Sequence, residues 1–199
     1  MKILDLLYIS LVNPRRGVYE TVFRYDNVHF VCGLLILALA TLSSIAGHGV
    51  MGNPMSGAGY YFPLCISDVT VHLAILVFLA FLLHGLFGVL GKKGNVLSLI
   101  TGLMISNVPF AYLACFSMIS QAMVKLSDND VLGSTFFLVS QFTVIVCFIT
   151  MIVDTIKLNY DFENATQAFI VLLIGVFISI FSVMMVFGGM FFSGLLRVL

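Results

Sequence analysis

Apolar residues fall into five long runs that are separated by short polar segments. The runs lie near 28–47, 66–90, 96–123, 132–154 and 165–190. A helix needs about 20 apolar residues to cross the hydrocarbon core of a bilayer, and each run is long enough. The pattern predicts an all-α, polytopic membrane protein, a compact bundle of five transmembrane helices.

Residues 1–27 follow a different pattern, with apolar stripes beside charged positions. The predicted apolar side of a first short helix consists of Ile3, Leu4, Leu7 and Leu11. Asn13 and Pro14 then suit the N-cap and the first position of a second helix. We expect 1–27 to be an amphipathic segment on the membrane surface and 28–199 to be the five-helix domain. An ordered lead-in that never touches lipid is the alternative.

The basic residues predict the topology. With a cytoplasmic N-terminus, the inner side carries Lys2, Arg15, Arg16, Arg24, Lys92, Lys93 and Lys157. Only Lys125 and Arg197 then lie outside. This bias follows the positive-inside rule, so the N-terminus is predicted to be cytoplasmic and the C-terminus outside.

Composition narrows the classes of function. The chain is 61% hydrophobic and 9% charged, and nine basic residues balance nine acidic ones. This leaves no room for a soluble domain and no electrostatic footprint for nucleic acid. Its four cysteines are scattered without metal-ligand spacing and are predicted to be free thiols. We expect no cofactor; the expected partners are the lipid bilayer and either another protein or a second copy of the chain.

Asp68, His72 and His84 interrupt the second apolar run. Positions 68 and 84 are separated by about 24 Å of helix rise, close to the thickness of the hydrocarbon core. The favoured interpretation is that these residues mark the two ends of the span. The alternative joins His48, Asp68 and His72 into an outward-facing metal or proton site, because Asp68 and His72 share a helix face.

The third run carries polar and helix-breaking residues near its middle. Pro109 cannot donate a hydrogen bond to the carbonyl of Ile105, so a kink is predicted there, with Asn107 beside it. Nearer the inner side, Asp154 is predicted to pair with Lys157. No paired carboxylates, no Ser or Cys with a placed His and no HExxH motif occur, so we expect no enzymatic activity.

Small residues predict where helices approach one another. Ser43 with Gly47, and Gly175 with Ser179, form small-xxx-small pairs. Glycines also recur every third residue at Gly85, Gly88, Gly91 and Gly94. The sequence therefore predicts close helix packing near the end of the second span, followed by a break at the turn "GKKGN".

The order of these features resembles the YIP-domain family, the Ypt/Rab-interacting membrane proteins. The similarity rests on "NPRRGVYETVF", "LFGVLGKKGN", "SNVPF" and "NATQAFIVLLIG", and it extends over nearly the whole chain. The matching positions are Pro14, Gly91, Lys92, Gly94, Pro109 and Ala168. The chain departs from many members at Met104 and Ile105, where they carry Gly-Tyr.

The resemblance implies five spans and a cytosolic N-terminus. Eukaryotic members are linked to Rab GTPases and vesicle traffic through long N-terminal regions that this sequence does not show. It is more similar to the short prokaryotic members, which implies a multi-pass protein of the bacterial inner membrane.

Two functions follow as hypotheses. The first is a non-enzymatic integral membrane protein that organises the membrane or partner proteins. The second is a small transporter or channel that uses His48, Asp68 and His72 outside and Asn107 midway. A transporter predicts a continuous polar path from the outer residues past Asn107, whereas an organising protein predicts a dry core.

Overall fold

The chain forms helices and no strand over the residues that the structure, a computed structural model, describes: 2–51, 58–127 and 130–196. The side chains of 48–51, 58–65, 182–183 and 185–196 lie outside this description. The helices are α1 (Ile3–Val12), α2 (Pro14–Phe23), α3 (Asn27–Met51), α4 (Ala58–Val89), α5 (Val96–Ile105), the 3₁₀ helix η1 (Val108–Tyr112), α6 (Leu113–Ser127), α7 (Asp130–Asn159) and α8 (Ala165–Leu196). The predicted all-α class is confirmed.

Among the described residues, four helices are candidate membrane spans. They are Asn27–Gly47, Ile66–Val89, Val96–Ser127 and Asp130–Asn159, each long and apolar enough to cross a bilayer. The protein is therefore a multi-pass membrane protein by the length and composition of its helices. The fully described part of α8, Ala165–Phe181, is apolar but shorter, so a fifth crossing remains a prediction.

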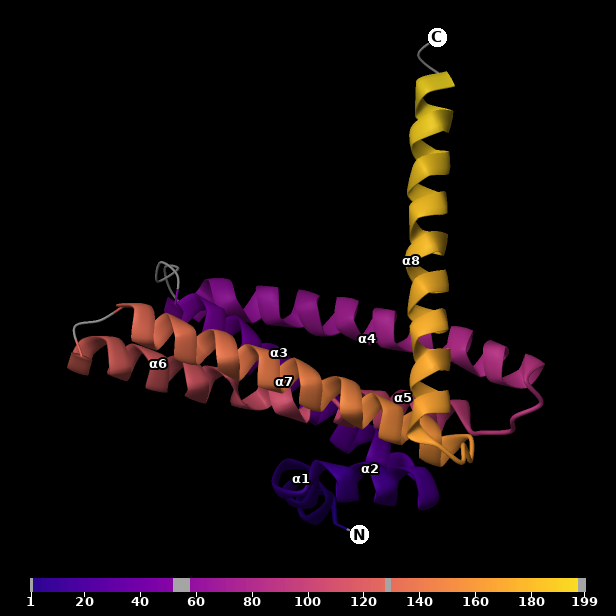
Figure 1. Ribbon diagram of the computed structural model, residues 1–199, viewed down its shortest axis with the longest axis horizontal. Coiled ribbons are helices and arrows are strands. Elements are labelled where there is room, and N and C mark those ends of the chain that lie inside the picture. The colour runs from indigo at the N-terminus through magenta and orange to yellow at the C-terminus, as the bar shows by residue number, and fades with distance from the viewer. Residues whose placement is uncertain (1, 52–57, 128–129, 197–199) are drawn as a thin grey trace.

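The helices form a bundle with one helix standing across it. Figure 1 shows α3, α4, α6 and α7 running alongside one another, with α1 and α2 together on one side and α8 crossing the bundle. Near its start, α8 buries Ala168 and Leu172, but Phe177 is 73% exposed. Because α8 is apolar on all sides, no stripe in its sequence directs its far half against the other helices. The observed arrangement is thus less compact than the predicted five-helix bundle.

The third span, α5–η1–α6, is the most buried of the four. In its most apolar stretch 72% of residues are buried, compared with 17% in α4.

The short helices α1 and α2 also pack against the bundle, because Leu6 and Val18 are fully buried in a cluster with α3 and η1. Of the predicted apolar side, Ile3, Leu7 and Leu11 pack against this cluster, whereas Leu4 is 72% exposed. Helix α1 is apolar on most sides, and tertiary contacts select its buried face.

The predicted small-residue pair Ser43 and Gly47 lies against α6. A methyl group on Gly47 would lie 3.2 Å from the backbone carbonyl of Leu113. The Ser43 hydroxyl accepts a hydrogen bond from the Ala114 N–H at 3.0 Å, and the Ser117 hydroxyl donates to the Gly47 carbonyl at 2.8 Å. These contacts let two backbones approach closely.

The glycines near the end of α4 do not lie against a neighbouring helix. Nothing lies within 4 Å of a methyl group built on Gly85 or Gly88, so the predicted close packing at these two positions was wrong. The close approach to α4 comes instead from Gly175 in α8, which faces Leu83. Spacing alone does not reveal whether a small residue faces a neighbouring helix or the outside of the bundle.

Candidate functional site

The turn "GKKGN" is held in a defined conformation at the end of α4. Gly91 has a φ of +71°, a left-handed conformation that glycine adopts without steric cost. The N–H of Lys92 donates to the carbonyl of Phe87 at 2.9 Å, which closes the helix end in the manner of a Schellman motif. The predicted helix break is therefore confirmed, and Gly91 is the residue that permits it.

This turn packs against the segment that joins α7 to α8. Lys92 Nζ donates to the carbonyl of Asp161 at 3.0 Å and lies 4.9 Å from the ring centroid of Phe162. The side-chain amide of Asn159 donates to the carbonyl of Asn95 at 3.0 Å. We name this assembly of Gly91–Asn95 with Asn159–Phe162 the turn junction.

Tyr160 is the centre of the turn junction. It is 1% exposed, and its ring centroid lies 4.1 Å from that of Phe87. Its hydroxyl forms a hydrogen bond of 2.7 Å with His84 Nδ1, so His84 has the polar partner that its position at the end of a span predicts. Burial raises the pKa of the Tyr160 hydroxyl to about 12. Sequence analysis missed Tyr160, because one tyrosine in a polar loop carries no pattern.

Replacing Tyr160 with phenylalanine is expected to lower the free energy of unfolding by about 1 kcal/mol, because His84 loses its hydrogen bond. The raised pKa gives the sign of the pH dependence: neutral Tyr160 stabilises the fold below pH ~10, and this contribution is lost as pH rises toward about 12. The difference between wild type and variant should therefore shrink from pH 9 to 12 in thermal unfolding. A constant difference would contradict this assignment.

The α1–α2 corner is fastened to the bundle by polar contacts. Pro14 occupies the first turn of α2, and the Asn13 side chain accepts the N–H of Arg16 at 3.3 Å, as predicted. Arg15 Nε lies 3.1 Å from Asp154 Oδ2, so Asp154 pairs with Arg15 and the predicted pair with Lys157 was wrong. The prediction considered neighbours within one helix, whereas the partner comes from a distant part of the chain.

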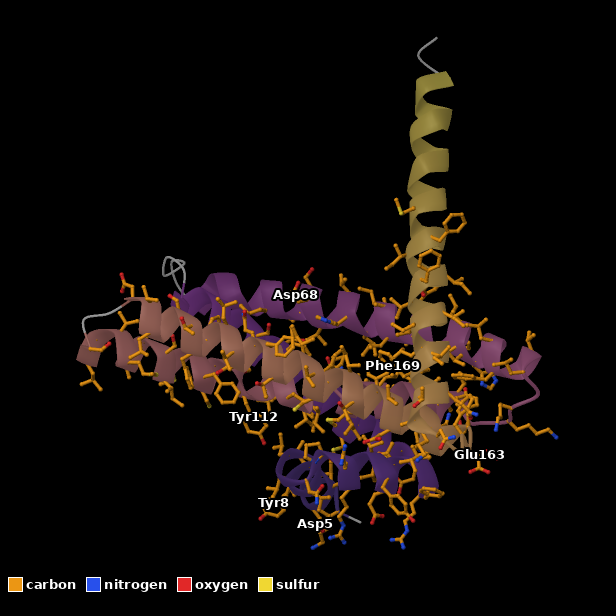
Figure 2. All side chains as sticks on the ribbon, viewed as in Figure 1. Asp5, Tyr8, Asp68, Tyr112, Glu163 and Phe169 are labelled. Carbon is orange, nitrogen blue, oxygen red and sulfur yellow. The ribbon has the colours of Figure 1, made fainter. Side chains whose placement is uncertain are left out.

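Tyr112 makes the second contact to this corner. Its hydroxyl donates to the carbonyl of Leu11 at 2.7 Å. Figure 2 shows Tyr112 on the side of the bundle that faces α1. Helices α1 and α2 are thus an integral layer of the fold; their place at a membrane surface stays a prediction.

The predicted break near Pro109 is confirmed. Helix α5 ends at Ile105, and η1 begins at Val108. The backbone N–H of Asn107 donates to the carbonyl of Met104 at 3.1 Å instead of to that of Leu103. The side-chain amide of Asn107 donates to the carbonyl of Leu103 at 2.9 Å. The buried Asn107 side chain therefore replaces the backbone donor that Leu103 loses at the break.

The structure describes the side chains of two of the three predicted outer residues. Asp68 is partly buried and His72 is exposed on α4, while the side chain of His48 lies outside the described residues. Figure 2 shows Asp68 on the side of the bundle opposite α1 and α2. Within the described part of the chain, no group of three or more His, Cys, Asp or Glu residues could hold a metal ion. His72 does border a cavity of about 120 Å³ together with Thr41, Ser44 and Asn107.

An Asp–His pair caps the start of α3. Asp26 Oδ1 accepts the backbone N–H of His29 at 3.1 Å and lies 2.7 Å from His29 Nδ1. These hydrogen bonds from His29 lower the pKa of Asp26. His29 Nε2 is buried without a partner among the described residues, so the pair does not reach a nucleophile. Its role in this structure is to turn the chain from α2 into α3.

Ala168, the last position taken from the family resemblance, is fully buried at the start of α8. It belongs to the same apolar cluster as Phe87, Tyr160 and Phe162. Ala168 thus shares an apolar cluster with Tyr160 and Phe162 of the turn junction, which also contains Gly91, Lys92 and Gly94. Pro14, Asn107 and Pro109 belong to other parts of the fold.

In comparisons with protein-family models, curated proteins and solved structures, nothing matches this chain. The resemblance to the YIP-domain family therefore stays a prediction from the motifs.

Proposed function

We propose that the protein is a non-enzymatic integral membrane protein that organises partner proteins at the end of the bundle formed by the turn junction. The observation that carries this proposal is a rigid surface with exposed charges. Lys93, Asp161 and Glu163 are exposed on two turns that the contacts of Lys92, Asn159 and Tyr160 hold together. Figure 2 shows Glu163 at this end of the bundle. A fixed set of charges selects a partner by electrostatic complementarity.

Charge reversal tests this proposal. Lys93→Glu should reduce capture of a partner in cross-linking of intact membranes. A partner that complements Lys93 presents negative charge there, and a glutamate at position 93 would repel it. Lys125→Glu, at the opposite end of the bundle, is the matched control and should leave capture unchanged. Equal capture by wild type and Lys93→Glu would contradict the proposal.

The proposed topology has five spans, with a cytoplasmic N-terminus and the C-terminus outside, in a bacterial inner membrane. Helix α8 has 32 residues, and an apolar helix of that length is more than sufficient for one crossing. The turn junction then lies on the cytoplasmic side, where the positive-inside rule places Lys92 and Lys93. The resemblance to the YIP-domain family supports the same topology.

Cysteine labelling of intact cells tests the topology. In a background without other cysteines, a membrane-impermeant reagent should label Arg197→Cys from outside and should not label Lys92→Cys. Residue 197 lies outside the described residues, so it tests the fifth crossing independently of the structure. The reverse labelling pattern would refute the positive-inside argument.

A specific observation supports a second candidate function, a small transporter or channel. The cavity beside His72 reaches Asn107, which joins an outer residue to the middle of the third span. A second cavity, of about 190 Å³, also borders Ser44 and extends to Gln141. From Asn107 toward the turn junction, however, residues 98–106 are all buried. The burial of this whole segment favours the organising function, because a transporter requires the polar path to continue toward the turn junction.

Flux through reconstituted vesicles separates the two functions. A transporter should collapse a proton or ion gradient faster than empty vesicles do, and His72→Gln should reduce that rate. The organising function predicts rates equal to those of empty vesicles for both proteins.

A further inference from the structure

A groove of about 510 Å³ lies where the corner between α1 and α2 meets η1, α6 and α7. Its borders include Val12, Arg15, Tyr112, Phe116, Cys147 and Thr150. None of these residues belongs to the turn junction, so the groove is a separate feature. Its volume falls within the range of about 300–1,000 Å³ that is usual for small-molecule sites.

The three hydroxyl groups that border the groove, those of Tyr112, Thr143 and Thr150, are engaged elsewhere. The Tyr112 hydroxyl donates to the carbonyl of Leu11 at 2.7 Å. The hydroxyls of Thr143 and Thr150 donate to carbonyls of their own helix at 2.9 and 2.8 Å. The wall therefore offers methyl groups and rings and suits an apolar ligand.

The groove opens to the outside of the bundle along α7. Cys147 is exposed there, and Val146 is 45% exposed. The lining from Thr143 to Met151 covers about 12 Å of helix rise. In a multi-pass membrane protein, an apolar groove that opens outward along a spanning helix faces the acyl chains of the bilayer. A hydrocarbon chain can therefore enter the groove from the bilayer.

Positive charge stands at one end of the groove. The Arg15 side chain is 72% exposed, and Arg16 beside it is also exposed. Asp154 contacts Arg15 through Nε, at one edge of the guanidinium. Arginine carries five N–H donors in a planar fork. A guanidinium that contacts a carboxylate at one edge can therefore still donate hydrogen bonds to a phosphate from its other N–H groups.

We propose that this groove binds an anionic glycerophospholipid of the bilayer, with an acyl chain along α7 and the phosphate at Arg15. An acyl chain gains little when it leaves bulk lipid for an apolar groove, because both surroundings are equally apolar. Selection must therefore come from the headgroup, and the arginines favour a net negative charge. The proposal does not depend on the organising function.

Native mass spectrometry tests the headgroup. Protein exchanged into equal amounts of phosphatidylglycerol and phosphatidylcholine should retain phosphatidylglycerol preferentially. Arg15→Gln should lower this preference about fivefold, the effect of one basic residue near a membrane surface. Arg24→Gln is the matched control, because Arg24 is similarly exposed but pairs with Glu20 outside the groove. Equal retention of both lipids by wild type would overturn the proposal.

Loss of Arg15 also leaves Asp154 without its partner. The double variant Arg15→Gln/Asp154→Asn removes both charges, so a loss of preference that persists in it comes from Arg15 itself. If the double variant recovered the preference of wild type, repulsion by Asp154 would explain the single variant, and the phosphate site would be refuted.

Two exposed cysteines test the acyl chain. Cys147→Phe should fill the groove and reduce retained phosphatidylglycerol several-fold, whereas Cys115→Phe places the same ring on an exposed position of α6 outside the groove. A lipid with a photoactivatable chain should cross-link within residues 143–151 of wild type. Equal effects of the two variants, or a groove cross-linked to a protein or a second copy instead of lipid, would overturn the proposal.

Discussion

Replacing Gly94 with alanine is expected to destabilise the protein by about 1–3 kcal/mol, the usual cost of overpacking. The added methyl group would lie 2.6 Å from Tyr160 Cε1 and 2.8 Å from the carbonyl oxygen of Asn159. Tyr160 cannot move aside easily, because Phe87 and His84 contact it on other sides. The backbone of one turn must therefore shift away from the other, which weakens every contact of the turn junction.

Thermal unfolding in detergent measures this effect. The thiol of Cys32 is fully buried, so its reaction with a fluorescent maleimide reports unfolding when the other cysteines are replaced. Gly88→Ala is the matched control: its methyl group would meet nothing within 4 Å, and alanine favours a helix by up to about 1 kcal/mol. If both variants unfolded at the same temperature, the close approach at Gly94 would be refuted.

The sequence predicted the elements of this fold better than their packing. Length and apolarity identify the long helices because a spanning helix has to meet a length requirement. Pro109 predicts the break in the third span for an equally local reason, since its ring removes a donor. The buried face of α1 and the direction of α8 could not be predicted in this way, because both helices are apolar on most sides.

In the candidate site too, local features could be predicted from the sequence and long-range contacts could not. Gly91 was recognisable because a helix end followed by a basic turn requires a residue that tolerates positive φ. Its neighbours Lys92 and Gly94 acquire a role only through Tyr160 and Asp161, which are distant in the chain. Likewise, Asp154 finds Arg15 rather than the nearby Lys157. One sequence does not contain the information that pairs such residues.

The outer residues are the least informative part of the sequence-based prediction. Asp68 and His72 were expected to stand at the outer end of the second span; they lie in the first half of α4, where Asp68 is partly buried and His72 is exposed. Their helical spacing fixes a shared face but not what that face meets. The cavity between His72 and Asn107 arises from packing of α3, α4, η1 and α7, which the sequence pattern does not encode.

Replacing Asn107 with leucine is expected to lower the free energy of unfolding by about 1–3 kcal/mol, because a buried carbonyl loses its donor. The carbonyl of Leu103 receives the Asn107 side chain, while the Asn107 N–H points to Met104. Leucine has a similar size and no donor, and no water from the bilayer core can replace the lost bond. Helix α5 should therefore unwind further toward its middle, where it packs against α3 and α7.

Hydrogen exchange and thermal unfolding together test this prediction for Asn107. Faster exchange is expected in residues 103–107 of Asn107→Leu, with a lower midpoint of Cys32 labelling. Thr143→Val is the control, since Thr143 is exposed and its hydroxyl only adds a second bond to a carbonyl within an unbroken helix, so its removal should have little effect. An Asn107→Leu variant as stable as Thr143→Val would show that the break at Pro109 is held by packing alone, without the hydrogen bond of Asn107.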